Sequence, residues 1–128
     1  MKNSILRDIN KFGVITKVKG RETKEVTDYS FLVLPTDLDY KLSLHDKNYV
    51  FRKLKVHKYA IQSAIKKLQK DRNSRQSIIQ FRVDTNKPNC ISSMQFLIRC
   101  DKLITIVYSR SLDVENKLYC DVEISRRI

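Results

Sequence analysis

The chain has 128 residues and a formal net charge of +12, and 41% of its residues are hydrophobic. This length suits one compact domain, and two glycines with two prolines leave no low-complexity linker. No apolar run reaches the ~20 residues of a membrane span, and the first residues lack the apolar core of a secretory signal, so a cytoplasmic protein without membrane association is expected. Three cysteines without metal-ligand spacing argue against a disulfide framework and a zinc site.

The N-terminal half predicts one short helix and two strands. The helix is expected at residues 5–12 and the first strand at 14–18, directly after a glycine. A second strand is expected at 29–34, where Pro35 ends it. Residues 36–51 have a poor pattern and are expected to be loop or irregular structure.

The C-terminal half predicts a long helix followed by three strands. Apolar residues recur at helical spacing between residues 56 and 70, at Ile61, Ala64, Ile65 and Leu68. Strands are expected at 76–83, 92–100 and 103–109, and residues 118–128 begin a last helix.

The last two strands are expected to form a hairpin that turns at Asp101 and Lys102. Strand alternation predicts that Met94, Phe96, Ile98 and Cys100 share one face. The elements together predict an α+β fold in which a mixed or antiparallel sheet is covered by one main helix.

Six residues of the C-terminal half carry polar chemistry at fixed separations: Cys90, Gln95, Arg110, Ser111, Asp113 and Asp121. This constellation resembles the nucleotide pocket of the thymidylate synthase and deoxycytidylate (dCMP) hydroxymethylase family. Two further stretches resemble phosphate-binding elements of that family. They are Ser74-Arg75-Gln76, and Lys19-Gly20-Arg21-Glu22-Thr23-Lys24-Glu25, in which Lys19 stands where the family has arginine.

The resemblance implies roles for these residues. The Cys90 thiolate would add to C6 of a pyrimidine, making C5 a nucleophile toward the one-carbon unit of methylenetetrahydrofolate. Arg110 and Ser111 would hold the nucleotide phosphate, joined by Lys19 and by Arg75 reaching across a homodimer. Gln95 would lie beside the pocket, and Asp113 would orient the pyrimidine carbonyl side.

Asp121 indicates which base is bound. Synthases acting on dUMP have asparagine at the matching position, whereas hydroxymethylases acting on dCMP have aspartate, and a carboxyl suits the amino-bearing cytosine edge. An alternative is that Asp121 caps the N-terminus of the last helix. For Asp113 the alternatives are a strand-end cap and a surface salt-bridge partner. Cys90 taken alone would be better explained as a buried structural thiol, and only its combination with the other pocket residues favours the nucleotide pocket.

Some parts of the family pattern are missing. Ile91 replaces the usual histidine, the chain has no Trp, and no glutamate lies between Glu25 and Glu115. We therefore expect a single thymidylate synthase-like domain at 1–128 that lacks the family's Glu-x-x-Trp segment and C-terminal half. The expected function is a retained pocket for dCMP or dUMP, and the missing proton relay argues against full catalysis by this chain.

A second reading starts from the charge. Residues 52–75 are strongly basic, and an amphipathic helix there predicts one cationic face formed by Lys58, Lys66, Lys67, Lys70 and Arg72. A solvated helix face explains such a run equally well. The alternative function is a non-catalytic protein that uses this face to bind RNA, DNA or an acidic protein.

Overall fold

The computed structural model describes residues 1–81 and 90–128. The elements follow in the order α1 (Lys2–Phe12), β1 (Val14–Val18), β2 (Arg21–Glu25), the short 3-10 helix η1 (Pro35–Leu38), α2 (Leu44–Val56), α3 (Lys58–Lys70), β3 (Ile78–Gln80), β4 (Ile91–Arg99), β5 (Lys102–Ser109) and α4 (Leu118–Arg126). Helices and antiparallel strands together confirm the α+β class. No helix within these described residues is long and apolar enough to cross a membrane.

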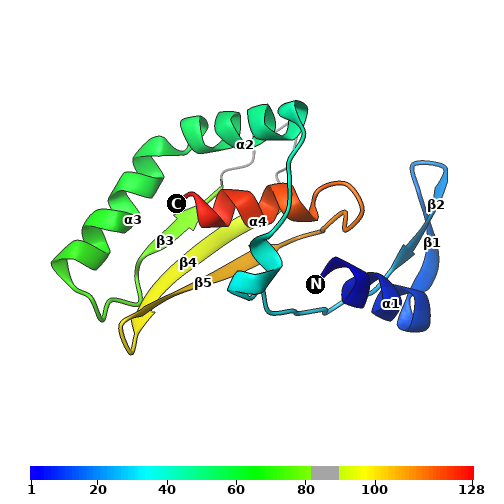
Figure 1. Cartoon of the computed structure of the whole chain (residues 1–128), viewed down its shortest axis with the longest axis horizontal. Coiled ribbons are helices and arrows are strands. Elements are labelled where there is room, and N and C mark those ends of the chain that lie inside the picture. The colour runs from blue at the N-terminus through cyan, green and yellow to red at the C-terminus, as the bar shows by residue number, and fades with distance from the viewer. Residues whose placement is uncertain (82–89) are drawn as a thin grey trace.

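The main sheet is antiparallel, in the order β3-β4-β5 (Figure 1). The β4–β5 hairpin turns at Cys100 and Asp101, one residue before the expected position, and Arg99 pairs with Lys102. Both turn residues have positive φ, 49° and 58°, which matches the right-handed twist of the two strands. The alternation predicted for β4 holds at its centre, where Met94 and Phe96 are buried.

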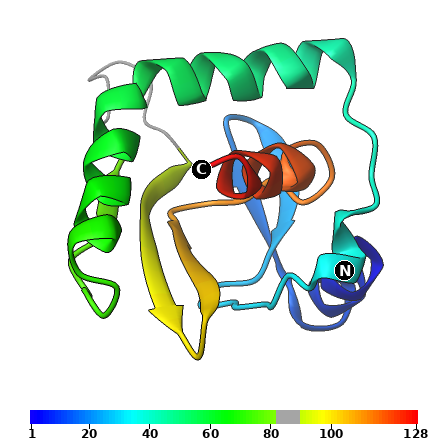
Figure 2. The same cartoon turned by 60° about the vertical axis from the view of Figure 1, so that its left-hand side comes forward.

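Helix α4 lies across one face of the sheet, and α2 and α3 frame it on two further sides (Figures 1 and 2). The main hydrophobic core joins Met94 and Phe96 of β4 to Ala64 of α3 and to Cys120 and Ile124 of α4. Five consecutive residues of α4, 120–124, are buried. Such a helix is interior on all sides, so every polar side chain on it needs a partner.

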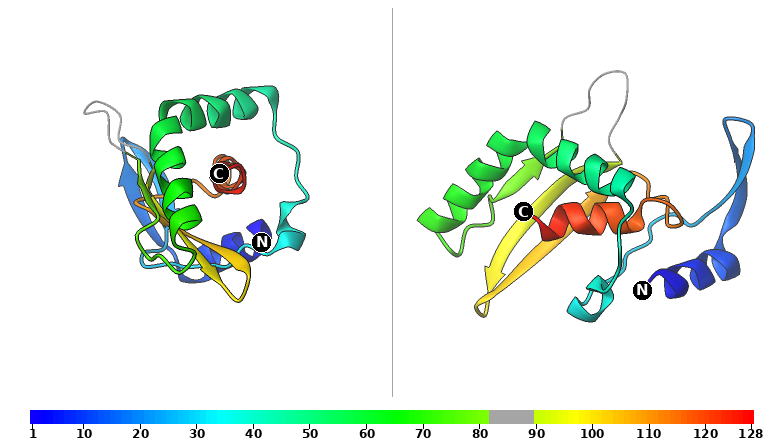
Figure 3. Two further views of the ribbon diagram at one scale, coloured as in Figure 1. Left: turned by 90° about the vertical axis from the view of Figure 1, so that its left-hand side faces the viewer. Right: turned by 45° about the horizontal axis from the view of Figure 1, so that its top comes forward.

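The N-terminal part forms a second, smaller packing unit. Ile5 of α1 packs with Val114, Leu118 and Val122, so α1 rests against the start of α4. The β1–β2 hairpin extends away from the three-stranded sheet (Figure 3). All five residues of β2 are exposed.

Two expectations for the N-terminal half are wrong. Residues 29–34 form no strand: β1 and β2 pair with each other, and this segment joins neither of the two sheets. Residues 36–51 are not irregular throughout, since they contain η1 and most of α2. The sheet is therefore covered by several helices rather than one main helix.

The other expected elements are present with shifted ends. The helix at 56–70 corresponds to α3, the last helix to α4, and the strands at 92–100 and 103–109 to β4 and β5. The strand expected at 76–83 is represented by β3, and residues 82 and 83 lie outside the described residues.

Candidate functional site

The hairpin brings Cys90 and Arg110 to the same end of the main sheet. Cys90 directly precedes β4 and Arg110 directly follows β5. The Arg110 backbone N–H donates to the Cys90 carbonyl oxygen at 2.8 Å. Cys90 is a half-buried free thiol, and Arg110 and Ser111 are exposed. Residues separated by twenty positions are therefore adjacent because an antiparallel hairpin joins them.

Asp121 is the most unusual side chain near this end of the sheet. It lies on α4, it is only 8% exposed, and within the described residues its Oδ2 atom has no hydrogen-bond partner. Burial raises its pKa to about 6, although the positive charges of Lys117 and Lys53 act in the opposite direction. Asp121 is not the N-cap of α4, because Lys117 occupies that position.

Glu123, two residues later, shows how a buried carboxylate is ordinarily stabilised. It is 5% exposed, but it accepts from the Arg127 guanidinium at 2.6 Å and from the Tyr40 hydroxyl at 3.0 Å. These hydrogen bonds and the nearby arginine charges lower its pKa even though burial acts to raise it. Two carboxylates on one helix therefore have opposite environments: Glu123 accepts hydrogen bonds from Arg127 and Tyr40, whereas the Oδ2 atom of Asp121 accepts none from the described residues.

Tyr49 of α2 links Asp121 to Cys90. Burial raises the Tyr49 pKa to about 12, and electrostatic interactions with Asp121, Cys90 and Cys120 add to that shift. From the sequence, Tyr49 was expected only as an aromatic residue near the basic surface and not in the nucleotide pocket, because it falls in a segment expected to be irregular. A signal for α2 exists in Ser43 and Asp46: the Ser43 hydroxyl accepts from the Asp46 backbone N–H at 3.1 Å and caps the helix.

Asp46 and Cys120 complete the polar surroundings on the α2 side. Burial, followed by a hydrogen bond to the Asp46 carboxylate, raises the pKa of the Cys120 thiol to about 11. Asp46 is also 3.6 Å from the Lys117 ammonium group. Cys120 therefore stays a neutral thiol near neutral pH, and Lys117 is positioned between two carboxylates, Asp46 and Asp121.

The remaining expected pocket residues are only partly gathered. Gln95 donates from its side-chain amide to the Arg75 carbonyl oxygen at 2.8 Å, which joins these two residues. Gln95 is five positions after Cys90, which is roughly 16 Å along a strand. Lys19 lies at the tip of the β1–β2 hairpin with φ 51°, away from the sheet (Figure 3).

The Asp113 carboxylate accepts hydrogen bonds from the turn in which it lies. Its Oδ1 accepts from the backbone N–H groups of Glu115 and Asn116 at 3.1 and 3.0 Å, and the Asn116 side chain donates to both carboxylate oxygens. These hydrogen bonds lower its pKa although burial acts to raise it. Asp113 therefore stabilises the turn that leads from β5 into α4.

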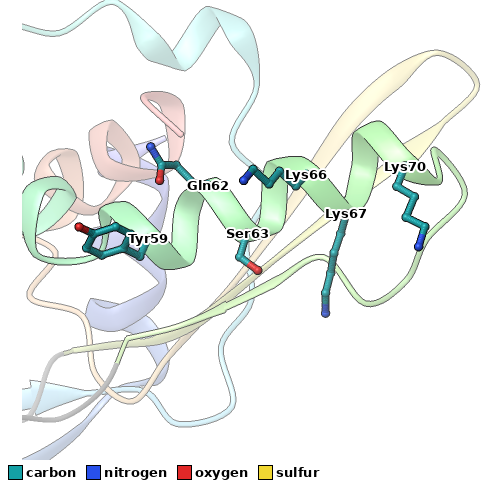
Figure 4. Close-up of a pocket in the computed structure, with 6 residues that line it drawn as sticks. All are labelled: Tyr59, Gln62, Ser63, Lys66, Lys67 and Lys70. Atoms are coloured by element: carbon teal, nitrogen blue, oxygen red, sulfur yellow. The ribbon is translucent and has the colours of Figure 1, made fainter.

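The basic residues of the second reading lie on the outside of the molecule. Lys66, Lys67 and Lys70 line a shallow hollow of about 390 Å³ on α3, together with Tyr59, Gln62 and Ser63 (Figure 4). Lys58 is exposed at the first position of α3. The Arg72 guanidinium is paired with the Asp101 carboxylate at 2.9 Å.

The arrangement at the end of the sheet suits acid–base or binding chemistry. A carboxyl with a pKa near 6 exchanges its proton close to neutral pH. Within residues 1–81 and 90–128, no group of three or more His, Cys, Asp or Glu side chains that could hold a metal ion is found. No protein-family model matches this sequence, and no curated protein matches it either.

Proposed function

We propose that the chain is a reduced relative of the thymidylate synthase and dCMP hydroxymethylase family that binds a deoxypyrimidine monophosphate beside Cys90 and Asp121. The observation that carries the proposal is the buried Asp121 carboxyl, whose Oδ2 atom accepts no hydrogen bond from the described residues. A buried charge with no partner costs stability, and such a cost is expected at a site that a ligand completes. The adjacency of Cys90 and Arg110 supports the same location.

Asp121 would read the base. A neutral carboxyl has one O–H donor and one carbonyl acceptor, which match the N3 acceptor and N4 amino donor of cytosine. A pKa near 6 makes this neutral form accessible close to neutral pH. The ionised form matches only the amino group and repels the N3 lone pair. The proposed ligand is therefore dCMP in preference to dUMP.

The exposed Arg110 and Ser111 would meet the phosphate at the open end of the sheet. A guanidinium binds two phosphate oxygens at once. Arg75 and Lys19 lie apart from this end in one chain. Either residue could contact the phosphate only from a second copy of the chain. The proposal therefore includes a homodimer in which Arg75 of one copy reaches the phosphate bound by the other.

The proposal is limited to binding, and turnover is a further step. Methylenetetrahydrofolate would supply the one-carbon unit to C5 of the pyrimidine. The sequence does not fit that reaction, because it has no tryptophan and no glutamate between Glu25 and Glu115. We therefore derive no step through the cofactor, and the role left to Cys90 is that of a thiol in contact with the pyrimidine ring.

Calorimetric titration of the chain with dCMP and dUMP tests the proposal. We expect measurable heat with dCMP and a weaker affinity for dUMP. An Arg110→Ala variant should lose affinity for both nucleotides equally, since it acts on the shared phosphate. A Lys41→Ala variant is the matched control, because Lys41 is exposed and belongs to no element of the site. No heat and no thermal shift with either nucleotide at millimolar concentration would reject the proposal.

A further inference from the structure

Helices α2 and α3 carry a dense positive charge, of which the proposed nucleotide site involves only Lys53, near Asp121. Residues 47–70 contain eight Lys and Arg residues and no Asp or Glu. They are Lys47, Arg52, Lys53, Lys55, Lys58, Lys66, Lys67 and Lys70. Exposed helix faces ordinarily alternate acidic and basic residues, because pairs at i,i+4 then attract. Here they cannot.

The apolar residues of α3 lie mainly on the face that packs against the core. Ala64 belongs to the main core, and Ile61 and Leu68 pack against it. The opposite positions are Tyr59, Gln62, Ser63, Lys66, Lys67 and Lys70, which follow one another at helical spacing and line one hollow (Figure 4). The hollow is therefore a continuous strip along the exposed side of one helix.

The lysines of this strip are only partly explained by the fold. The Lys67 ammonium donates to the Gln76 carbonyl oxygen at 3.1 Å, and both Lys67 and Lys70 lie in the last turn, where the helix dipole favours cations. Lys66 and Lys70 make no ion pair with any residue that the structure describes. They stand at i,i+4 on the same face, where like charges repel.

Tyr59 lies at the other end of the strip and is 84% exposed. Its ring contacts no other aromatic ring in the described part of the chain. Tyr59 and Lys70 are eleven residues apart, which is about 16 Å along a helix and leaves room for a short run of nucleotides. Figure 4 shows Tyr59 toward the N-terminal end of α3 and the lysines toward the C-terminal end.

We propose that this strip binds a single-stranded nucleic acid, with a base stacked on Tyr59 and phosphates held by Lys66, Lys67 and Lys70. An exposed aromatic ring beside a cationic track is the arrangement with which proteins hold single strands without reading their sequence. An acidic protein would use the lysines but gain nothing specific from the ring. A duplex keeps its bases stacked inside, so it too would leave Tyr59 unused.

Fluorescence anisotropy with a labelled oligothymidylate of about 16 nucleotides tests the proposal. Three phosphate contacts predict a log–log salt slope near −2, from about −0.7 per contact on a single strand. Tyr59→Ala should weaken binding roughly 5- to 100-fold, while Tyr59→Phe should keep most of it. Lys66→Glu/Lys70→Glu should abolish most binding and remove about 1.4 from the slope.

The matched control is Lys17→Glu/Lys41→Glu, which makes the same change in net charge at exposed positions outside α2 and α3. It should lower affinity far less than the α3 pair. Circular dichroism checks that each variant is folded. Binding that is unchanged by Tyr59→Ala, equal in both charge variants, or absent for the oligothymidylate overturns the proposal. Tighter binding of the matching duplex or of polyglutamate also overturns it. The dCMP titration is independent, because none of these substitutions touches Asp121 or Cys90.

Discussion

Replacing Asp121 by asparagine should stabilise the protein at alkaline pH. The aspartate is 8% exposed, its Oδ2 has no hydrogen-bond partner in the described residues, and its pKa is about 6. One pKa unit corresponds to about 1.4 kcal/mol, so a rise from about 3.9 in the unfolded chain carries about 3 kcal/mol. Asparagine has the same shape without the charge. Removing the charge should therefore gain about 3 kcal/mol, and burying the asparagine amide should cost about 1–2 kcal/mol. About 1–2 kcal/mol of net stabilisation remains at pH 8.

The pH dependence separates this cause from simple repacking. Because the folded protein binds the proton more tightly, the wild-type penalty is full above pH 6 and disappears as the pH falls toward 4. Urea unfolding of both proteins should therefore show the stability difference falling by about 3 kcal/mol between pH 8 and pH 4. A difference that is constant within about 0.5 kcal/mol over this range would refute the buried, unpartnered carboxyl.

Three further predictions concern other parts of the molecule. Glu123→Gln should destabilise the protein by about 1–2 kcal/mol at pH 7, because the half-exposed Arg127 guanidinium loses its charge partner. This loss of stability should vanish at low pH, where Glu123 is protonated in the wild type as well. Urea unfolding of both proteins at pH 7 and pH 3 measures the two differences. Cys100→Asn/Asp101→Gly should raise the midpoint of thermal unfolding, by about 1 kcal/mol of stability, since both residues have positive φ in a two-residue turn; an unchanged or lower midpoint contradicts the turn geometry. A 5-fluoropyrimidine nucleotide with methylenetetrahydrofolate should form no covalent adduct detectable by mass spectrometry, because the proposal is limited to binding; an adduct that forms on the wild type and is lost in Cys90→Ser would contradict this limit.

Local patterns predicted the elements whose partners are near in sequence. Ile61, Ala64 and Leu68 are sufficient to identify α3, because each turns the same face to the core. The β4–β5 hairpin was predictable for the same reason, apart from a shift of one residue at its turn. The apolar run at 29–34 was misleading, because a strand exists only where another strand offers an edge, and that is a property of the whole fold.

The candidate site was predictable in part. Cys90 and Arg110 lie next to each other, as their spacing in the sequence allowed, because they flank the two ends of one hairpin. The burial of Asp121 could not be read from its neighbours, since Glu123 is equally acidic and equally buried on the same helix. What separates them is that Arg127 and Tyr40 reach Glu123, whereas no described residue forms a hydrogen bond with the Oδ2 atom of Asp121, and these contacts depend on how the helices pack.

The measurement that tests the central claim most directly is an NMR titration of the Asp121 carboxyl carbon, with and without dCMP. The protein is labelled with ¹³C at aspartate carboxyl carbons, and the Asp121→Asn variant assigns the signal. We expect a pKa of about 6 in the free protein and a higher pKa with dCMP, because the base shares the carboxyl proton. A pKa near 4 that does not move when dCMP is added would contradict the account.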